Sequence, residues 1–315
     1  MTLSRILCAT DLSGLSRPAL VQARALAAWE GADLHVVQVG DRLLARAAGG
    51  VRTVVSSVSI PADGLEHSRV TTVARRGSAV DVIVRYARFM AADLIVVGAA
   101  LPRGGVPEWQ SIGEAVARRT SVPTLVVPPV DEAAREDLPF RNVVCAIDTV
   151  TGSPAALERA LAVAQRAGGR LTLVQVLSDV AEDGRLRYVE PEYRRLRETE
   201  ARERVWSAVP REALDWAAIA VEVRTGIAAD EIVAAADRVG ADLIVLGVMH
   251  ESAMPLLPQT ITRAVTARAA CPVLVVREAA AVTDPRQLGA AWLQSAGSSA
   301  QAVAGAAAQP VEGGV

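Results

Sequence analysis

Two aspartates, Asp11 and Asp148, stand at the same place in two related segments of the chain. Each follows directly on a short apolar run, RILCAT before Asp11 and NVVCAI before Asp148. A carboxylate at the end of such a run could satisfy backbone N–H groups at the start of the next helix. It could equally accept a hydrogen bond from the base or ribose of a bound ligand. The residues alone support both interpretations equally.

Other kinds of chemistry are excluded by residues that are absent. All 33 basic residues are arginine. Without lysine there is no Walker P-loop and no Schiff-base mechanism. The sequence also has no HExxH and no GxSxG motif. The three cysteines, Cys8, Cys145 and Cys271, are odd in number and lack CxxC spacing, which argues against a disulfide framework and against a metal site.

The three histidines differ in what their surroundings indicate. His35 lies within a strand pattern, which favours a structural or surface role, and His67 lies in a polar loop with no partner suggested. His250 is the stronger candidate for ligand contact, because its loop is expected to face the ligand site described below.

The chain repeats itself. The segments RILCATD (5–11) and LHVVQV (34–39) match NVVCAID (142–148) and LTLVQV (171–176) at an offset of 137 residues. Gly77, Gly98 and VPTLVV (122–127) match Gly226, Gly247 and CPVLVV (271–276) at an offset of 149. One insertion in the second copy explains the change of offset, so the pattern indicates a duplicated domain.

Within each copy, short apolar runs alternate with helical patterns. In the first copy we expect strands at 6–9, 34–39, 70–74, 94–97 and 124–127 and helices at 16–30, 78–90 and 112–119. This order predicts an α/β fold with two doubly wound, parallel, five-stranded sheets produced by tandem duplication. Ser78 to Asp81 has the spacing of a capping box.

A doubly wound sheet binds ligands beyond the carboxyl ends of its strands, at the point where the strand order reverses. The loops after the first and fourth strand of each copy should therefore hold the site. The candidate residues are Ala9, Thr10, Asp11, Val39, Gly98, Ser111, Ala146, Asp148, Val176, Gly247, His250 and Thr260.

The length of 315 residues suits two domains. We expect the first at 1–130, a linker at 131–139, the second at 140–279, and a disordered Ala/Gly-rich tail at 280–315. The formal net charge of −2 indicates neither a nucleic-acid nor a membrane partner. No long apolar segment stands near the start, so a cytoplasmic protein is expected.

The openings ILCATD and VVCAID, the strands ADLIVVG and ADLIVLG, and the endings VPTLVV and CPVLVV resemble the universal stress protein family in both copies. This resemblance implies an adenine-nucleotide alpha-hydrolase-like fold with flavodoxin-like layering and a role in the stress response. It also implies that domains pair through their last strands, here 124–127 and 273–276, within one chain. A homodimer is a further expectation.

Family members that bind ATP carry Gly-x2-Gly-x9-Gly-(Ser/Thr) after the fourth strand, where glycines let backbone N–H groups approach the phosphates. Here Gly98 and Gly247 remain, and Leu101 and His250 stand at the second glycine. After eight intervening residues, where the pattern has nine, Gln110-Ser111 and Gln259-Thr260 replace the last pair. Both loops depart from the pattern in the same way, which favours lost or weakened phosphate binding.

We therefore expect a regulatory or protective binding protein of the stress response that needs no cofactor and is not a metabolic enzyme. The alternative is an ATP- or AMP-binding stress protein with weak or no hydrolysis. A divergent nucleotide-dependent enzyme lacks support, because no general base, nucleophile or metal cluster is visible.

Overall fold

The computed structural model describes residues 3–11, 16–39, 69–99, 112–129, 140–148, 153–178, 190–248 and 261–277. Residues 40–68, the expected linker at 131–139 and the expected tail at 280–315 lie outside these residues. We call the elements up to residue 129 copy one and those from residue 140 copy two.

Copy one alternates strands and helices in the predicted order. Its elements are β1 (Arg5–Thr10), α1 (Arg17–Glu30), β2 (Asp33–Val39), β3 (Val70–Arg75), α2 (Ala79–Phe89), β4 (Leu94–Gly98), α3 (Ile112–Arg119) and β5 (Thr124–Val127). The expected end of α1 at Gly31 is confirmed, since Gly31 has a φ of 66° and closes the helix.

The capping box predicted at Ser78 is not formed. Ser78 is the residue before α2, but its side chain makes no capping hydrogen bond. Asp81 pairs with Arg119 of α3, with an N–O distance of 2.6 Å. Hydrogen bonds from Arg119 and, to a smaller extent, from Ser78 lower the pKa of the Asp81 carboxyl, so this carboxylate contacts both the helix start and α3.

Copy two repeats the order and has two further described helices between its second and third strands. Its elements are β6 (Asn142–Ala146), α4 (Pro154–Ala167), β7 (Arg170–Leu177), α5 (Pro191–Ala208), a 3-10 helix η3 (Arg211–Asp215), β8 (Ala218–Thr225), α6 (Ala228–Val239), β9 (Leu243–Val248), α7 (Ile261–Arg268) and β10 (Val273–Arg277).

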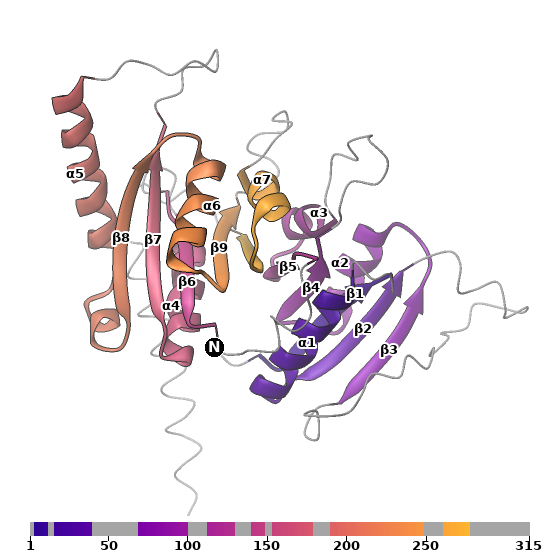
Figure 1. Cartoon of the computed structure of the whole chain (residues 1–315). Helices are drawn as coiled ribbons and strands as arrows, with labels where there is room; N and C mark the ends of the chain where they lie inside the picture. Colours follow the sequence, from indigo (N-terminus) through magenta and orange to yellow (C-terminus); the bar gives the residue numbers. More distant parts are fainter. Residues whose placement is uncertain are drawn as a thin grey trace, which may run out of the picture.

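The described strands form one sheet of 10 strands in the order β3-β2-β1-β4-β5-β10-β9-β6-β7-β8 (Figure 1). Within each copy the five strands are parallel, as predicted. The copies join where β5 and β10 pair antiparallel, with Leu125 opposite Leu274 and Val126 opposite Val273. We call this junction the seam, and it confirms that the two last strands pair. It also covers two apolar edges that would otherwise be open to other chains.

Alternate residues of each strand face two separate hydrophobic layers. One layer packs α1, α4 and α5 on the sheet and contains Ile6, Cys8, Leu125 and Leu274. The other packs α2, α3, α6 and α7 on the opposite side and contains Leu7, Val126 and Val273. Strands buried on both faces explain why the repeated LIVV segments are apolar throughout.

Candidate functional site

The strand order places a reversal point in each copy. In copy one the chain runs from β1 outward to β2 and β3 and then returns to β4 on the other side of β1. In copy two the same reversal falls between β6 and β9. The carboxyl ends of β1 and β4, and of β6 and β9, are therefore where a ligand site is expected in this fold.

The candidate residues of copy one gather at this edge of the sheet. Ala9 ends the register with β4 opposite Val97, one residue before Gly98. Thr10 lies opposite Gln38 of β2, next to Val39. Ala9 and Thr10 are buried, Val39 and Gly98 are half-buried and Asp11 is exposed. Ser111 lies outside the described residues.

The hydroxyl of Thr10 is already engaged. Its Oγ1 lies 2.7 Å from the Oγ of Ser16, and both side chains are buried. Ser16 precedes α1 but makes no side-chain capping hydrogen bond. The two hydroxyls thus tie the end of β1 to the start of α1, and Asp11, directly after β1, is exposed to solvent.

In copy two, different contacts connect the end of the first strand to the start of the next helix. The residue equivalent to Thr10 is Ile147, which has no hydroxyl and is buried. Ser153, equivalent to Ser16, instead accepts a hydrogen bond from the backbone N–H of Asp148 at 3.2 Å. Ala146, Val176 and Gly247 are half-buried at the same edge, as is Asp148. His250 and Thr260 lie outside the described residues.

The candidate residues chosen from the sequence did not include one pair of polar residues at these edges. Gln38 and Gln175 are each buried near the end of the second strand of their copy. The Oε1 atom of Gln38 has no hydrogen-bond partner among the described residues. The repeated VQV segment was the signal, since a glutamine inside an apolar strand is costly to bury without partners.

The backbone N–H that follows Gly98 in copy one already donates a hydrogen bond. The N–H of Ala99, directly after Gly98, donates to the carbonyl of Val127 at 2.7 Å. This bond extends the pairing of β4 with β5 beyond the last strand residue. That N–H therefore points along the sheet and not toward a phosphate beyond its edge.

No catalytic or metal-binding arrangement is seen in the part of the chain that the structure describes. No group of three or more His, Cys, Asp or Glu side chains there could hold a metal ion. The Nδ1 of His35 lies 3.1 Å from the Tyr86 hydroxyl, and burial lowers the pKa of this histidine. This contact fits the structural role expected for His35. In the same residues, no helix is long and apolar enough to cross a membrane.

The aspartate of the repeated ADLIV segment has a structural role. Asp93 accepts hydrogen bonds from the backbone N–H groups of Ser4 and Arg5 at 2.8 and 2.9 Å. Asp242 does the same for Arg141 and Asn142 at 2.6 and 3.0 Å. Each carboxylate thereby fixes the start of the first strand beside the start of the fourth, at the end of the sheet opposite to the candidate site.

A doubly wound sheet with its reversal point between the first and fourth strands is consistent with the adenine-nucleotide alpha-hydrolase-like class of fold. The Universal stress protein family model matches residues 2–128 and 139–277. The chain therefore belongs to the universal stress protein family, with two copies of its domain in tandem. No curated protein matched in a separate comparison.

Two solved structures that cover most of this chain agree with this fold. A universal stress protein from Archaeoglobus fulgidus DSM 4304 shares 19% identity with a TM-score of 0.58, covering 88% of this chain and 97% of that chain. The functionally unknown protein PA1789 from Pseudomonas aeruginosa PAO1 shares 16% identity with a TM-score of 0.57, covering 94% of this chain and 98% of that one. A universal stress protein from Archaeoglobus fulgidus in complex with dAMP shares 22% identity with a TM-score of 0.32, covering 44% of this chain and 99% of that chain.

Proposed function

We propose that this protein is a regulatory or protective binding protein of the stress response. Its two sites at the reversal points of the strand order do not bind nucleotide phosphates tightly. The observation that carries the proposal is the hydrogen bond of the Ala99 N–H to Val127. It uses the first backbone donor after Gly98, in a loop whose later glycine positions hold Leu101 and Gln110.

The remaining groups at the copy-one edge support the same conclusion. Phosphate binding in such loops depends on free N–H groups and on a hydroxyl near a helix start. Thr10 and Ser16 direct their hydroxyls to each other. In copy two the hydroxyl of Ser153 accepts a hydrogen bond from the backbone N–H of Asp148. These hydrogen bonds occupy groups that a phosphate could otherwise use, and we propose no catalytic role for the residues at either edge.

The alternative is that the protein binds ATP or AMP. Gly98 and Gly247 stand at the ends of the fourth strands, and Ser111 and Thr260 supply a hydroxyl further along each loop. In this alternative Asp11 and Asp148 would contact the base or ribose, beside Val39 and Val176.

Thermal unfolding with and without millimolar Mg-ATP or AMP distinguishes the two functions. A ligand at a hundredfold excess over its dissociation constant stabilises the fold by about 2.7 kcal/mol. We expect little or no shift for the parent protein. A variant with Leu101→Gly, Gln110→Gly and one inserted loop residue should gain an ATP-dependent shift.

The matched control carries the same insertion with Leu101→Ala and Gln110→Ala, and it should show no shift. Nucleotide that copurifies with the parent, or parent binding at micromolar concentration, would overturn the proposal in favour of the alternative. Release of inorganic phosphate by the parent would show that it is an ATPase.

A further inference from the structure

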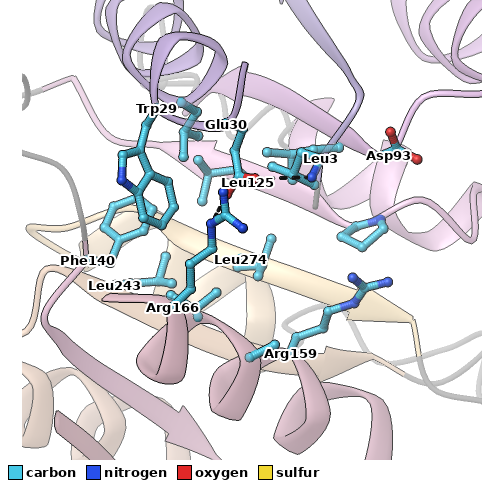
Figure 2. Close-up of a pocket in the computed structure, with 15 residues that line it drawn as sticks. Leu3, Trp29, Glu30, Asp93, Leu125, Phe140, Arg159, Arg166, Leu243 and Leu274 are labelled. Atoms are coloured by element: carbon cyan, nitrogen blue, oxygen red, sulfur yellow. Dashed lines mark hydrogen bonds and ion pairs between the residues drawn. The ribbon is translucent and has the colours of Figure 1, made fainter. Parts of the chain in front are cut away.

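A cavity lies between the two copies, at the strand ends opposite to the candidate nucleotide sites. It has a volume of about 90 Å³ and opens between α1 and α4 over the seam (Figure 2). Leu94 and Leu243, the first residues of β4 and β9, line it together with Leu125 and Leu274. Both copies contribute to its walls, so the cavity exists only in the paired protein.

The cavity wall is mostly apolar. Leu125 and Leu274 are opposite each other in the seam and lie on the side of the sheet that faces α1 and α4. Trp29 and Phe140 add aromatic surface at one end of the view in Figure 2. An apolar body placed here would be removed from water on several sides, which favours binding.

Three of the four charged side chains that line the cavity have partners. Glu30 forms an ion pair with Arg166 at 2.9 Å and accepts a hydrogen bond from the Leu3 N–H at 3.3 Å. Arg166 also lies over the ring of Trp29, 4.9 Å from its centre. Asp93 is held by the two backbone N–H groups at the start of β1.

Arg159 of α4 is the fourth, and it makes no hydrogen bond or ion pair with any described residue. Burial lowers the pKa of its guanidinium, while Glu158 and Asp93 raise it. Figure 2 shows the side chain extending from α4 on the same side of the cavity as Asp93. A partly buried arginine keeps its charge and its five N–H donors. An anion beside it could accept the hydrogen bonds that burial has removed from water.

We propose that this cavity binds a short carboxylic acid with a branched apolar chain, whose carboxylate pairs with Arg159 and whose chain packs on Leu125 and Leu274. The planar guanidinium matches a carboxylate through two parallel N–H···O bonds. A benzene ring occupies an apolar cavity of about 150 Å³ in an engineered protein. The volume of about 90 Å³ here favours a smaller body, such as a branched chain of four or five carbons.

The test uses the full chain and isovalerate as the probe, with titration calorimetry as the measurement. Isovaleramide has the same shape without the charge, and benzoate has the charge on a larger body. We expect saturable binding of isovalerate, with isovaleramide and benzoate each weaker by about tenfold or more. Isovalerate should also raise the melting temperature of the protein.

Two variants locate the binding. Arg159→Gln should weaken isovalerate binding by about tenfold or more, because it removes the cationic fork. Ala162→Phe fills the cavity from α4 and should abolish binding while leaving Arg159 in place. Arg204→Gln, on the exposed face of α5, is the matched control and should bind as the parent does.

The proposal is overturned if isovalerate gives no saturable binding at tens of millimolar, or if isovalerate and isovaleramide bind equally. Unchanged binding by a folded Arg159→Gln would overturn it as well. If that variant does not fold, Ala162→Phe and the comparison of acid with amide still decide the question.

Discussion

Trp29 and Arg166 occupy the same position in the two copies, 137 residues apart as Cys8 and Cys145 are, and they contact each other across the seam. The guanidinium carbon of Arg166 lies 4.9 Å from the centre of the Trp29 ring. In a symmetric dimer of identical copies, this position would meet itself. The duplicated chain has placed a cation on one side and an aromatic ring on the other, which is a favourable pair.

The first prediction concerns Arg166 as the partner of Glu30. The Glu30 side chain is only 3% exposed, and burial raises the pKa of its carboxyl while Leu3 and Arg166 lower it. Arg166→Met should lower the free energy of unfolding by about 2 kcal/mol at neutral pH, because it leaves a buried carboxylate without its cation. Denaturant unfolding measures this loss.

The stability loss of the Arg166→Met variant should depend on pH, and the Glu30 carboxyl sets the sign of this dependence. Without Arg166, the folded-state pKa of Glu30 lies above its unfolded value, so the cost appears as pH rises through the folded pKa. The deficit of Arg166→Met should therefore be smaller near pH ~4 than at pH ~7. Adding Glu30→Gln should remove this pH dependence. An equal deficit at both pH values would contradict the assigned role of Glu30.

The second prediction concerns Asp93 and Asp242. Each accepts backbone N–H groups at the start of the first strand of its copy. Asp93→Ala and Asp242→Ala should each lower the free energy of unfolding by about 2 kcal/mol, because each variant loses two hydrogen bonds to a charged acceptor, which are worth more than neutral ones. Asp237→Ala, at an exposed position of α6, is the control and should change it by less than about 0.5 kcal/mol. Similar values for all three variants would refute the structural role.

The third prediction compares two helix ends at the same repeat position. Ala91 follows α2 with a φ of 49°, and Gly240 follows α6 with a φ of 62°. Both ends close with equivalent backbone bonds, from Ala92 to Ala87 and from Ala241 to Ala236. A left-handed backbone disfavours a side chain, so Ala91→Gly should raise the free energy of unfolding by about 1 kcal/mol.

Gly240→Ala is the reciprocal change and should lower the free energy of unfolding by about 1 kcal/mol. An added Cβ at Gly240 would meet no atom within 4 Å, so the effect comes from the backbone alone. Thermal unfolding of both variants checks the pair. Changes of the same sign in both would show that backbone strain at these ends is not the cause.

The fourth prediction concerns Cys8. Complete burial raises the pKa of its thiol from 9.0 to about 12. The unfolded chain loses this proton above pH 9.0 while the folded chain keeps it, so stability falls as pH rises from 9.0 toward 12. Cys8→Ala should reduce that slope by up to about 1.4 kcal/mol per pH unit. Denaturant unfolding across this range checks it, and parallel curves for parent and variant would contradict it.

The fifth prediction tests the domain limits that we propose, 1–130 and 140–279. Two separate fragments with these limits should associate with each other when coexpressed, because Trp29 meets Arg166 only in the mixed pair. Native mass spectrometry should show the mixed pair in preference to either homodimer. If the two fragments remain monomeric and do not associate, the seam does not drive pairing.

Much of this protein could be predicted from local patterns. The matched segments revealed the duplication, and the apolar runs revealed all five described strands of copy one. The pairing of the LVV segments was implied by the family resemblance, and it agrees with the need to cover two apolar edges. The reversal point followed from the order of parallel strands, since their crossovers obey one hand.

Contacts between the copies could not be predicted in this way. Nothing in the local pattern distinguishes Asp93 as a strand anchor, and the helical periodicity of α1 and α4 does not reveal that Trp29 faces Arg166. Asp81 shows the same limit, because its local spacing indicated a capping box and did not reveal its ion pair with Arg119 of α3. The sequence by itself determined the two parallel five-stranded halves, because periodic burial and strand order are local properties, whereas their union into one sheet of 10 strands is a tertiary contact. The tertiary structure decided the ion pair of Glu30 with Arg166 and the cavity around Arg159, because these exist only where the antiparallel seam brings α1 and α4 together.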